Sequence, residues 1–302
     1  MRSHARPTAP LTPGQIIAAF GRHFLVKTVD DIALPCVMRG KKGGIACGDQ
    51  VEIRHTGSGQ GVIETILPRS TLLYRSDAYR EKLIAANVTQ VIIMVAAVPS
   101  FSEELINRCL AAAENQRLNV LIVLNKVDLV RETQAAAATL ALYRDLGYTL
   151  VELSAKSNAA PLLPYLAGHL NVLVGQSGMG KSTLINALLP EAGCVTGGIS
   201  AALDSGRHTT THARLYELDE RSSIIDSPGL QEFGLHQLHD DELTWGFIEF
   251  RPYIGRCRFS DCRHAHEPGC ALIQALREGR ISRRRFDFYH TLALTSGNHS
   301  PD

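Results

Sequence analysis

A glycine-rich turn between an apolar segment and an amphipathic one lies near the middle of this 302-residue chain. Residues 175–182 read GQSGMGKS and fit the pattern GxxxxGK[ST]; NVLV precedes them, and the stretch STLINALL begins at Ser182. Glycines let the backbone direct its N–H groups at phosphate oxygens, and a helix N-terminus adds partial positive charge. The turn therefore predicts a phosphate-binding loop, which requires a strand before it and a helix after it.

The residue types in this loop indicate which part of a bound nucleotide each residue would contact. Lys181 is expected to reach the β- and γ-phosphates, and the Ser182 hydroxyl is expected to bind Mg²⁺. The residues expected to contact nucleotide are Gly175, Gln176, Ser177, Gly178, Met179, Gly180, Lys181, Ser182 and Thr183.

The sequence NKVD (125–128) ends the apolar segment NVLIVLN and indicates which base is bound. The Asp128 carboxylate can accept hydrogen bonds from N1–H and the 2-amino group of guanine. Adenine offers neither donor, and a buried carboxylate without partners costs more than a lost neutral hydrogen bond of ~1–3 kcal/mol. We expect Lys126 to pack along the base or the phosphate loop, and Asn125 to tie the loops together.

A second candidate guanine loop is SAK (154–156), which also ends an apolar segment. Ser154, Ala155 and Lys156 are expected in the nucleotide site, with the backbone N–H of Ala155 facing guanine O6. Together with the phosphate loop, the two guanine motifs favour GTP over ATP.

The order of these motifs along the chain is unusual. GTPases ordinarily begin with the phosphate loop and end with the guanine motifs, whereas here 125–128 and 154–156 precede 175–182. The sequence thus predicts a circularly permuted domain, which folds tolerate because chain termini often lie close together at the surface. In this order the second switch leads directly into the C-terminal region and offers a route for coupling.

Two further segments fit the switch regions. DSPG (226–229) fits DxxG, so Asp226 is expected to hold Mg²⁺ through water and the Gly229 N–H to sense the γ-phosphate. In GRHTTT (206–211), Thr210 is the expected Mg²⁺ ligand.

The residue that orients the attacking water is not at its common place. Many GTPases carry Gln directly after DxxG, but Leu230 stands here and cannot hold water. We predict that His208 in the first switch is catalytic and orients the water once a partner orders the loop. Gln231 is an alternative, and a low intrinsic rate is a third possibility.

The pattern divides the chain into four segments. The sequence predicts a disordered basic arm over residues 1–13. The short alternating apolar runs of residues 14–68 predict a small β-barrel or another five-stranded β domain. Residues 69–233 predict an α/β domain with a largely parallel sheet, and 234–302 a helical, Arg-rich domain. The strands expected in the α/β domain cover 90–97, 119–125, 149–155, 171–177, 213–219 and 222–228, and its main helices 102–116 and 181–190.

Charge is distributed unevenly over these segments. Residues 1–68 contain eight Lys/Arg and five Asp/Glu, residues 69–250 fourteen and twenty, and residues 251–302 nine and five. Basic ends around an acidic middle suit a polyanionic partner, although solvated surfaces would give the same counts. No run approaches the ~18–20 apolar residues of a membrane span, and residues 1–14 lack the apolar core of a secretory signal. We therefore expect a cytoplasmic protein.

Cysteines and histidines cluster near the C-terminus. Cys257-x4-Cys262-x-His264-x5-Cys270 offers three sulfurs and an imidazole, which suits tetrahedral structural zinc, with His266 as a competing fourth ligand. We expect this domain to have little apolar core of its own, so that the metal would hold it together. After the cluster, five arginines between 277 and 285 are followed by Phe286, Phe288 and Tyr289. This helix either binds RNA or places an aromatic stripe in the core.

The combined order NKVD, SAK, GQSGMGKS, GRHTT, DSPG and C-x4-C-x-H-x5-C resembles the ribosome small-subunit-dependent GTPase A family over residues 14–290. The resemblance implies an N-terminal OB-fold that binds RNA, a permuted GTPase domain and a zinc-binding C-terminal domain. It also implies a GTPase (a phosphoric anhydride hydrolase) that assists late maturation of the small ribosomal subunit and is stimulated by it.

By the same resemblance, Cys257, Cys262, His264 and Cys270 hold one Zn²⁺, and the family's proposed catalytic histidine falls on His208. The partners implied are GTP or GDP with Mg²⁺ (held by Ser182 and Thr210), the small subunit and its rRNA; we expect a monomer that does not bind membranes. DSPG stands where DTPG is usual, and the interval between SAK and the phosphate loop is slightly short. The rival interpretations are a P-loop ATPase, an RNA-binding scaffold that holds GTP as a structural ligand, and a GTPase acting on another RNA such as tRNA.

Overall fold

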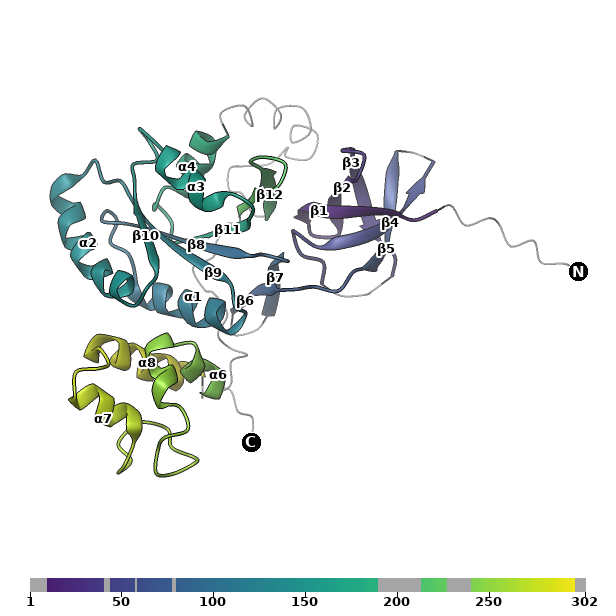
Figure 1. Cartoon of the computed structure of the whole chain (residues 1–302). Coiled ribbons are helices and arrows are strands. Elements are labelled where there is room, and N and C mark those ends of the chain that lie inside the picture. The colour runs from purple at the N-terminus through teal and green to yellow at the C-terminus, as the bar shows by residue number, and fades with distance from the viewer. Residues whose placement is uncertain are drawn as a thin grey trace, which may run out of the picture.

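The computed structural model describes residues 10–40, 44–57, 59–77, 80–189, 213–226 and 240–296. A β-barrel, a helix-covered central sheet and a C-terminal helical domain follow one another along the chain, with the helical domain next to α1 (Glu103–Asn115) (Figure 1). The fold class expected from the sequence is confirmed. The boundaries of the predicted segments remain predictions, and residues 1–9 of the expected arm lie outside the described residues.

The barrel closes through five pairings of neighbouring strands. β1 (Thr12–Phe20) pairs antiparallel with β2 (His23–Thr28) and with β4 (Gln50–Thr56), β2 pairs with β3 (Ala33–Met38), and β5 (Gln60–Ile66) joins β3 and β4. Alternate side chains point inward, so Ile16, Val26 and Ile53 are fully buried. This alternation explains why the short apolar runs of the sequence predicted a barrel.

The central sheet has the order β10-β9-β8-β11-β13-β12. Its members are β8 (Gln90–Ala96), β9 (Asn119–Asn125), β10 (Thr149–Glu152), β11 (Leu170–Val174), β12 (Arg214–Glu217) and β13 (Ser223–Asp226). All neighbours are parallel except β12 and β13. Every residue of β8 is buried, as expected for a central strand between two helical layers. The carboxyl ends of the parallel strands therefore face one edge, where open α/β sheets bind ligands.

Helices cover this sheet on both faces. α1 and α2 (Val130–Asp145) follow β8 and β9, whereas α4 (Lys181–Leu188) follows β11. Short turns η1 (Ala160–Leu162) and α3 (Leu163–Leu166) lead into β11. Figure 1 shows α3 and α4 together on the side of the sheet away from α1.

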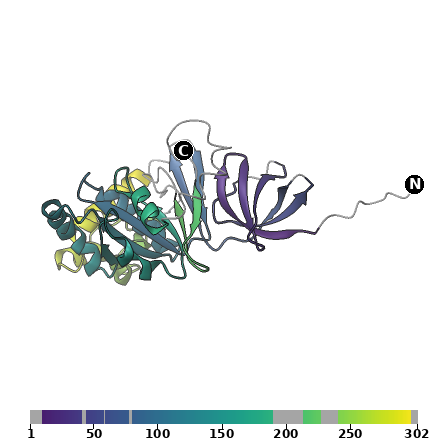
Figure 2. The ribbon, with the colours of Figure 1, turned by 90° about the horizontal axis from the view of Figure 1, so that it is seen from above.

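A two-stranded hairpin, β6 (Leu72–Asp77) and β7 (Arg80–Ala86), connects the barrel to the sheet. The sequence did not predict this hairpin or the bounds of α2. The side chain of Gln116, just after α1, accepts from the Leu72 N–H and donates to the Leu72 carbonyl, both at 3.0 Å. The barrel also touches the sheet directly, because β1 pairs with β12 at Ala18 and Arg214 (Figure 2).

The C-terminal domain packs on α1. It comprises α6 (Asp240–Trp245), η2 (Ile248–Tyr253), α7 (Ala271–Arg277) and α8 (Arg283–Ser296). Gly246 approaches α1 so closely that a Cβ there would lie 2.7 Å from Ala111 Cα. Phe247 and Phe250 stack in its interior and Tyr289 meets both rings edge to face, at centroid distances of 5.0–5.5 Å. The buried aromatic residues of this domain belong to the same apolar cluster as Ile106 and Leu110 of α1, so the domain shares its core with the central sheet and helices.

Buried polar groups fasten α8 to the rest. The Arg285 side chain is fully buried and donates from Nε to Glu249 Oε1 at 2.6 Å, with Asn107 of α1 as a second acceptor. Its guanidinium also lies 4.3 Å from the ring centroid of Phe247. Next to it, Arg284 Nη2 donates to Glu103 Oε2 at 2.6 Å. These bonds join the C-terminal domain to the helix that follows β8.

We predict that Arg285→Ala lowers the free energy of unfolding by about 3–5 kcal/mol, because Glu249 is left as a buried carboxylate without its partner. Arg283→Ala is the matched control. It removes an arginine whose side chain is 75% exposed and paired with Asp287, and it should cost at most ~1 kcal/mol. Urea unfolding followed by circular dichroism measures both, and equal losses for the two variants would contradict the prediction.

Candidate nucleotide and metal sites

The motif residues gather at the carboxyl edge of the central sheet. NKVD begins at the end of β9, SAK follows β10, the phosphate loop follows β11, and Asp226 ends β13. Because these strands are parallel neighbours, the segments 125–128, 154–156, 175–182 and Asp226 open on the same edge. The tertiary structure thus unites segments that the sequence placed on separate strands.

Asn125 connects three of these segments. Its side chain is 2% exposed; Nδ2 donates to the Met179 carbonyl at 2.8 Å, and Oδ1 accepts from the Ala155 N–H at 2.8 Å. Met179 lies in the phosphate loop and Ala155 in SAK, so one amide fixes both loops to the end of β9. A buried amide that satisfies donor and acceptor in this way defines a single arrangement.

Lys126 and Asp128 point to opposite parts of the site. Lys126 Nζ donates to the carbonyls of Gly178 and Val98, both at 2.7 Å, and so lies along the phosphate loop. Asp128 is exposed, and its Oδ1 accepts from Ser154 Oγ at 2.6 Å. This hydrogen bond lowers the pKa of Asp128. The carboxylate is thus held ionised beside SAK, where Lys156 is also exposed.

Glycines are required at both ends of the phosphate loop. Gly175 has φ +157°, and a Cβ there would lie 2.4 Å from the Met94 carbonyl oxygen. Gly180 has φ +99°, and a Cβ there would lie 2.3 Å from Asn125 Nδ2. The positive φ and the close backbone approach exclude a side chain at either position without local rearrangement.

The two charged residues Lys181 and Asp226 are partly buried. Lys181 Nζ donates to the carbonyls of Gly175 and Gln176, and burial lowers its pKa. Burial also raises the pKa of Asp226, an effect that Lys181 partly offsets. Two half-buried ionisable groups of opposite charge are suited to a ligand that carries both phosphates and a divalent cation. Ser182 and Thr183 are exposed at the start of α4, and Ser177 is exposed in the loop.

Gln176 makes a contact that no sequence motif indicates. Its Oε1 accepts from the backbone N–H of Ser102 at 2.7 Å, and Ser102 is the N-cap of α1. The phosphate loop is thus bonded to the start of α1, which carries the C-terminal domain. Ser102 before Glu103-Glu104 was a recognisable cap signal, but nothing in the sequence pairs it with Gln176.

Some predicted site residues lie outside the described part of the chain. They are His208, Thr210 and Gly229, together with Leu230 and Gln231. Their roles remain predictions from sequence.

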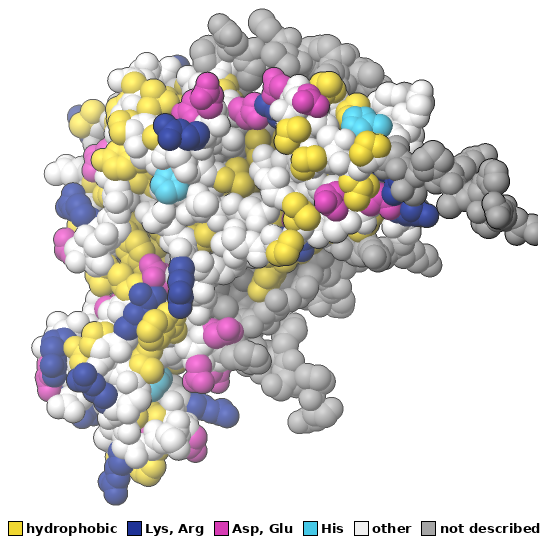
Figure 3. Space-filling model, turned by 45° about the vertical axis from the view of Figure 1, so that its right-hand side comes forward, with side chains coloured by type: hydrophobic (Ala, Val, Ile, Leu, Met, Phe, Trp, Pro, Cys, Tyr) yellow, Lys and Arg dark blue, Asp and Glu magenta, His cyan; other side chains and the backbone are white. Residues whose placement is uncertain are grey.

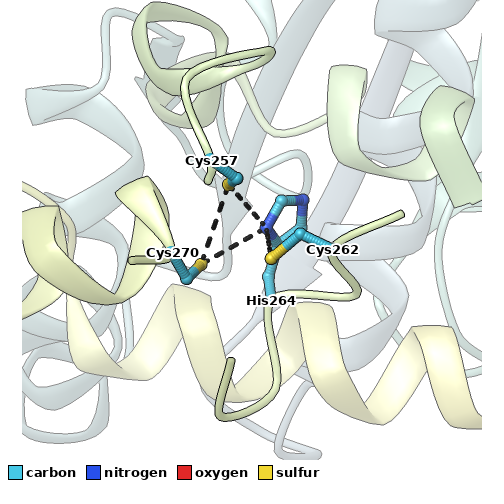
Figure 4. A group of neighbouring side chains, drawn as sticks. All are labelled: Cys257, Cys262, His264 and Cys270. Carbon is cyan, nitrogen blue, oxygen red and sulfur yellow. Dashed lines mark hydrogen bonds between the residues drawn. The ribbon is translucent and has the colours of Figure 1, made fainter. Parts of the chain in front are cut away.

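The cysteine and histidine cluster forms one group at the C-terminal domain (Figure 4). His264 Nδ1 lies 3.5, 3.5 and 3.4 Å from the sulfurs of Cys257, Cys262 and Cys270. Ligands bound at about 2.0 Å (N) and 2.3 Å (S) in tetrahedral geometry are roughly 3.5 Å apart for N–S pairs and roughly 3.8 Å for S–S pairs. The 4.0 Å between the sulfurs of Cys257 and Cys270 agrees with this. The four side chains fit a metal ion, whereas His266 is exposed and outside the group.

A carboxylate orders the segment between these ligands. Glu267 accepts from the backbone N–H groups of Arg263, Ala265 and His266 at 2.8–3.1 Å. Burial raises the pKa of Glu267, but these donors outweigh it and hold the pKa at about 2. The Glu267 carboxylate therefore makes its hydrogen bonds within the segment, to the backbone around His264.

Phosphate and guanine loops joined in this order define the class of circularly permuted GTPases, and solved structures have the same fold. YjeQ from Thermotoga maritima is similar with TM-score 0.74 and 29% identity, covering 96% of this chain and 100% of its own. YloQ, titled a circularly permuted GTPase, is similar with TM-score 0.72 and 25% identity, covering 99% of this chain and 100% of its own.

Within the class of circularly permuted GTPases, sequence similarity identifies one family. The model of the RsgA GTPase family matches residues 66–236. The Small ribosomal subunit biogenesis GTPase RsgA of Nitrosospira multiformis is 66% identical over 294 residues, which cover 97% of this chain and 94% of that protein. The chain therefore belongs to the RsgA GTPase family and is a GTP hydrolase, which confirms the resemblance inferred from its motifs. No helix in the described part of the chain has the length and apolar character to cross a membrane.

We predict that the purified protein carries one equivalent of metal and that His264→Ala and Cys270→Ala lose it, because three ligands leave an open position that weakens binding. His266→Ala is the control and should retain the metal, since His266 lies outside the ligand group. Elemental analysis after dialysis measures the content, and loss in His266→Ala but not in His264→Ala would reverse the assignment.

Proposed function

We propose that this GTPase binds the small ribosomal subunit, assists its late maturation and hydrolyses GTP faster when bound to it. The observation that carries the proposal is the 66% identity, over 97% of the chain, to the protein named Small ribosomal subunit biogenesis GTPase RsgA. The subunit presents rRNA, a polyanion, to which the basic residues 1–68 and 251–302 are complementary. We propose in addition that the protein acts as a monomer in the cytoplasm.

We propose that GTP lies across the carboxyl edge of the central sheet. The guanine faces Asp128, which Ser154 holds ionised. The N–H of Ala155, which donates to Asn125 in this structure, would exchange that acceptor for guanine O6. The phosphates lie in the loop 175–182, whose N–H groups and Lys181 would compensate their charge. The placement of Lys181 supports this, because its current acceptors are carbonyls of the same loop, which it can exchange for phosphate oxygens.

Mg²⁺ would be held by Ser182 and Thr210, with Asp226 acting through water and Gly229 sensing the γ-phosphate. The cation compensates the charge of the β- and γ-phosphate oxygens when bound. Asp226 is half-buried and close enough to Lys181 for their charges to interact, which supports this role.

The metal in the C-terminal domain is proposed to be zinc. Three thiolates and one imidazole are the donor set of structural zinc sites, and the distances within the group suit tetrahedral coordination. All four positions are taken by protein atoms, so the ion would have a structural role.

The proposal is tested by steady-state GTP hydrolysis with and without purified small ribosomal subunits at fixed low salt. Salt is fixed because phosphate contacts are strongly screened. Stimulation of tenfold or more by small subunits, absent with large subunits or tRNA, is the expected result. Equal rates in all cases, with GTP still bound, would reject the small subunit as the activating partner.

We predict that Asp128→Asn weakens GTP binding roughly 10- to 150-fold, because a charged hydrogen bond worth about 1.5–3 kcal/mol is lost. The variant should bind xanthosine triphosphate better than the wild type, since an amide N–H can donate to the carbonyl that replaces the 2-amino group. Fluorescent-nucleotide titration measures both affinities. Asp145→Asn, an exposed change on α2, is the control, and unchanged GTP affinity in Asp128→Asn would contradict the assignment.

We predict that His208→Ala loses stimulation by the small subunit while GTP binding stays at the wild-type level. The reason is that Leu230 cannot hold the attacking water, so the imidazole would orient it. Single-turnover hydrolysis on saturating subunits gives the rate, and Gln231→Ala is the matched alternative. A wild-type rate in His208→Ala with subunits present would exclude His208 as the catalytic residue.

A further inference from the structure

Residues 254–263, here called the metal loop, lead from η2 into the cysteine and histidine cluster and contain Cys257 and Cys262. Between and beside these ligands, Arg256, Arg258, Phe259 and Arg263 are exposed. The nucleotide site and the metal ligands do not use these four side chains. On the face drawn in Figure 3, the C-terminal domain carries several exposed Lys or Arg side chains.

Among the described residues, the arginines of the metal loop differ from most others in the domain because they have no acidic partner. Arg251, Arg280, Arg283, Arg284 and Arg285 each form an ion pair with a carboxylate. Arg256, Arg258 and Arg263 form no ion pair within the described part of the chain. Asp261 is the single acidic residue of the loop, so the loop carries net positive charge on its solvent side.

Phe259 is exposed, whereas Phe288 is half-buried and the other phenylalanines of the described C-terminal domain are buried. Phe259 is 42% exposed, whereas Phe247 and Phe250 are fully buried and Phe286 is 6% exposed. The Arg258 guanidinium carbon lies 5.4 Å from the Phe259 ring centroid, so an aromatic ring and a planar cation are adjacent on the surface. Ile254, 38% exposed, adds apolar surface to the same loop.

The loop is held in this arrangement before any partner binds. The Arg258 N–H donates to the Gly269 carbonyl at 3.1 Å. A Cβ at Gly269 would lie 2.9 Å from Arg258 Cβ, so the stem of Arg258 passes directly over this glycine. Glu267 binds the backbone N–H of Arg263, and the ligand cluster fixes Cys257 and Cys262. Little backbone conformational entropy is therefore left to lose on binding.

We propose that the metal loop binds unpaired RNA, with one base stacked on Phe259 and adjacent phosphates paired with Arg256, Arg258 and Arg263. Sequence-tolerant recognition of single-stranded RNA combines base stacking on aromatic rings with arginine contacts to the backbone. An acidic peptide would use the arginines but not the face of the ring, and paired RNA hides its base faces. This inference rests on the proposed binding to the small ribosomal subunit.

Binding of full-length variants to purified small subunits tests the role of the ring. Stacking on an aromatic residue is worth about 1–3 kcal/mol, so Phe259→Ala should weaken binding roughly 5- to 150-fold. Phe259→Leu keeps the apolar bulk without the ring and should bind as weakly as Phe259→Ala. Phe259→Tyr keeps the ring and should bind as the wild type does. Leu294→Ala, which removes a side chain 75% exposed on α8, is the apolar control.

The arginines are tested by salt dependence. Replacing Arg256, Arg258 and Arg263 together with Gln should reduce the slope of log K against log salt by about 2, given roughly 0.7 for each phosphate contact with a single strand. Arg144→Gln, an exposed change on α2, is the charge control. Elemental analysis of each variant verifies that the metal, and with it the loop, is retained.

Ultraviolet crosslinking of the wild-type complex distinguishes the partners. The expected result is an RNA nucleotide attached within residues 254–263. If the wild type does not bind small subunits, the proposed function fails and this inference fails with it. If it binds and Phe259→Leu binds equally well, or if the loop crosslinks to a ribosomal protein, the inference is overturned while the proposed function stands.

Discussion

The buried amide of Asn125 organises the nucleotide edge of the molecule. It donates to the carbonyl of Met179 and accepts from the N–H of Ala155, so the phosphate loop and the second guanine loop are positioned by one side chain at the end of β9. Gly180 lacks a side chain where Asn125 Nδ2 approaches it. Because a buried amide left without partners is costly, the three loops are stable only together.

The second organising element is α1. Its N-cap residue, Ser102, bonds to Gln176 of the phosphate loop, and Glu103 one residue later bonds to Arg284 of α8. At its other end, Glu114 pairs with Arg251 at 2.6 Å. The C-terminal domain is therefore attached to the GTPase sheet along a whole helix, a connection distinct from the direct chain link through the second switch.

The C-terminal domain shows why composition alone is ambiguous. An arginine-rich segment with aromatic residues suited either an RNA-binding helix or a core stripe, and in α8 the rings of Phe286 and Tyr289 lie in the core. Arg285 is buried with them because its charge is met by Glu249. Phe259 and its neighbouring arginines differ from these residues because they are exposed to solvent. The sequence alone does not show which residues are exposed.

The sequence by itself determined the motif order, the permutation, the central strands and the three cysteines of the candidate metal group, because neighbouring residues encode loop chemistry and strand periodicity. The bounds of β9, 119–125, agree with the apolar run. Only the tertiary structure decided which distant groups meet: Gln176 with Ser102, Arg285 with Glu249, and the hairpin of β6 and β7 between barrel and sheet. The physical reason is that such contacts join residues far apart in the chain, and their free energy arises from burial and packing that no local pattern records.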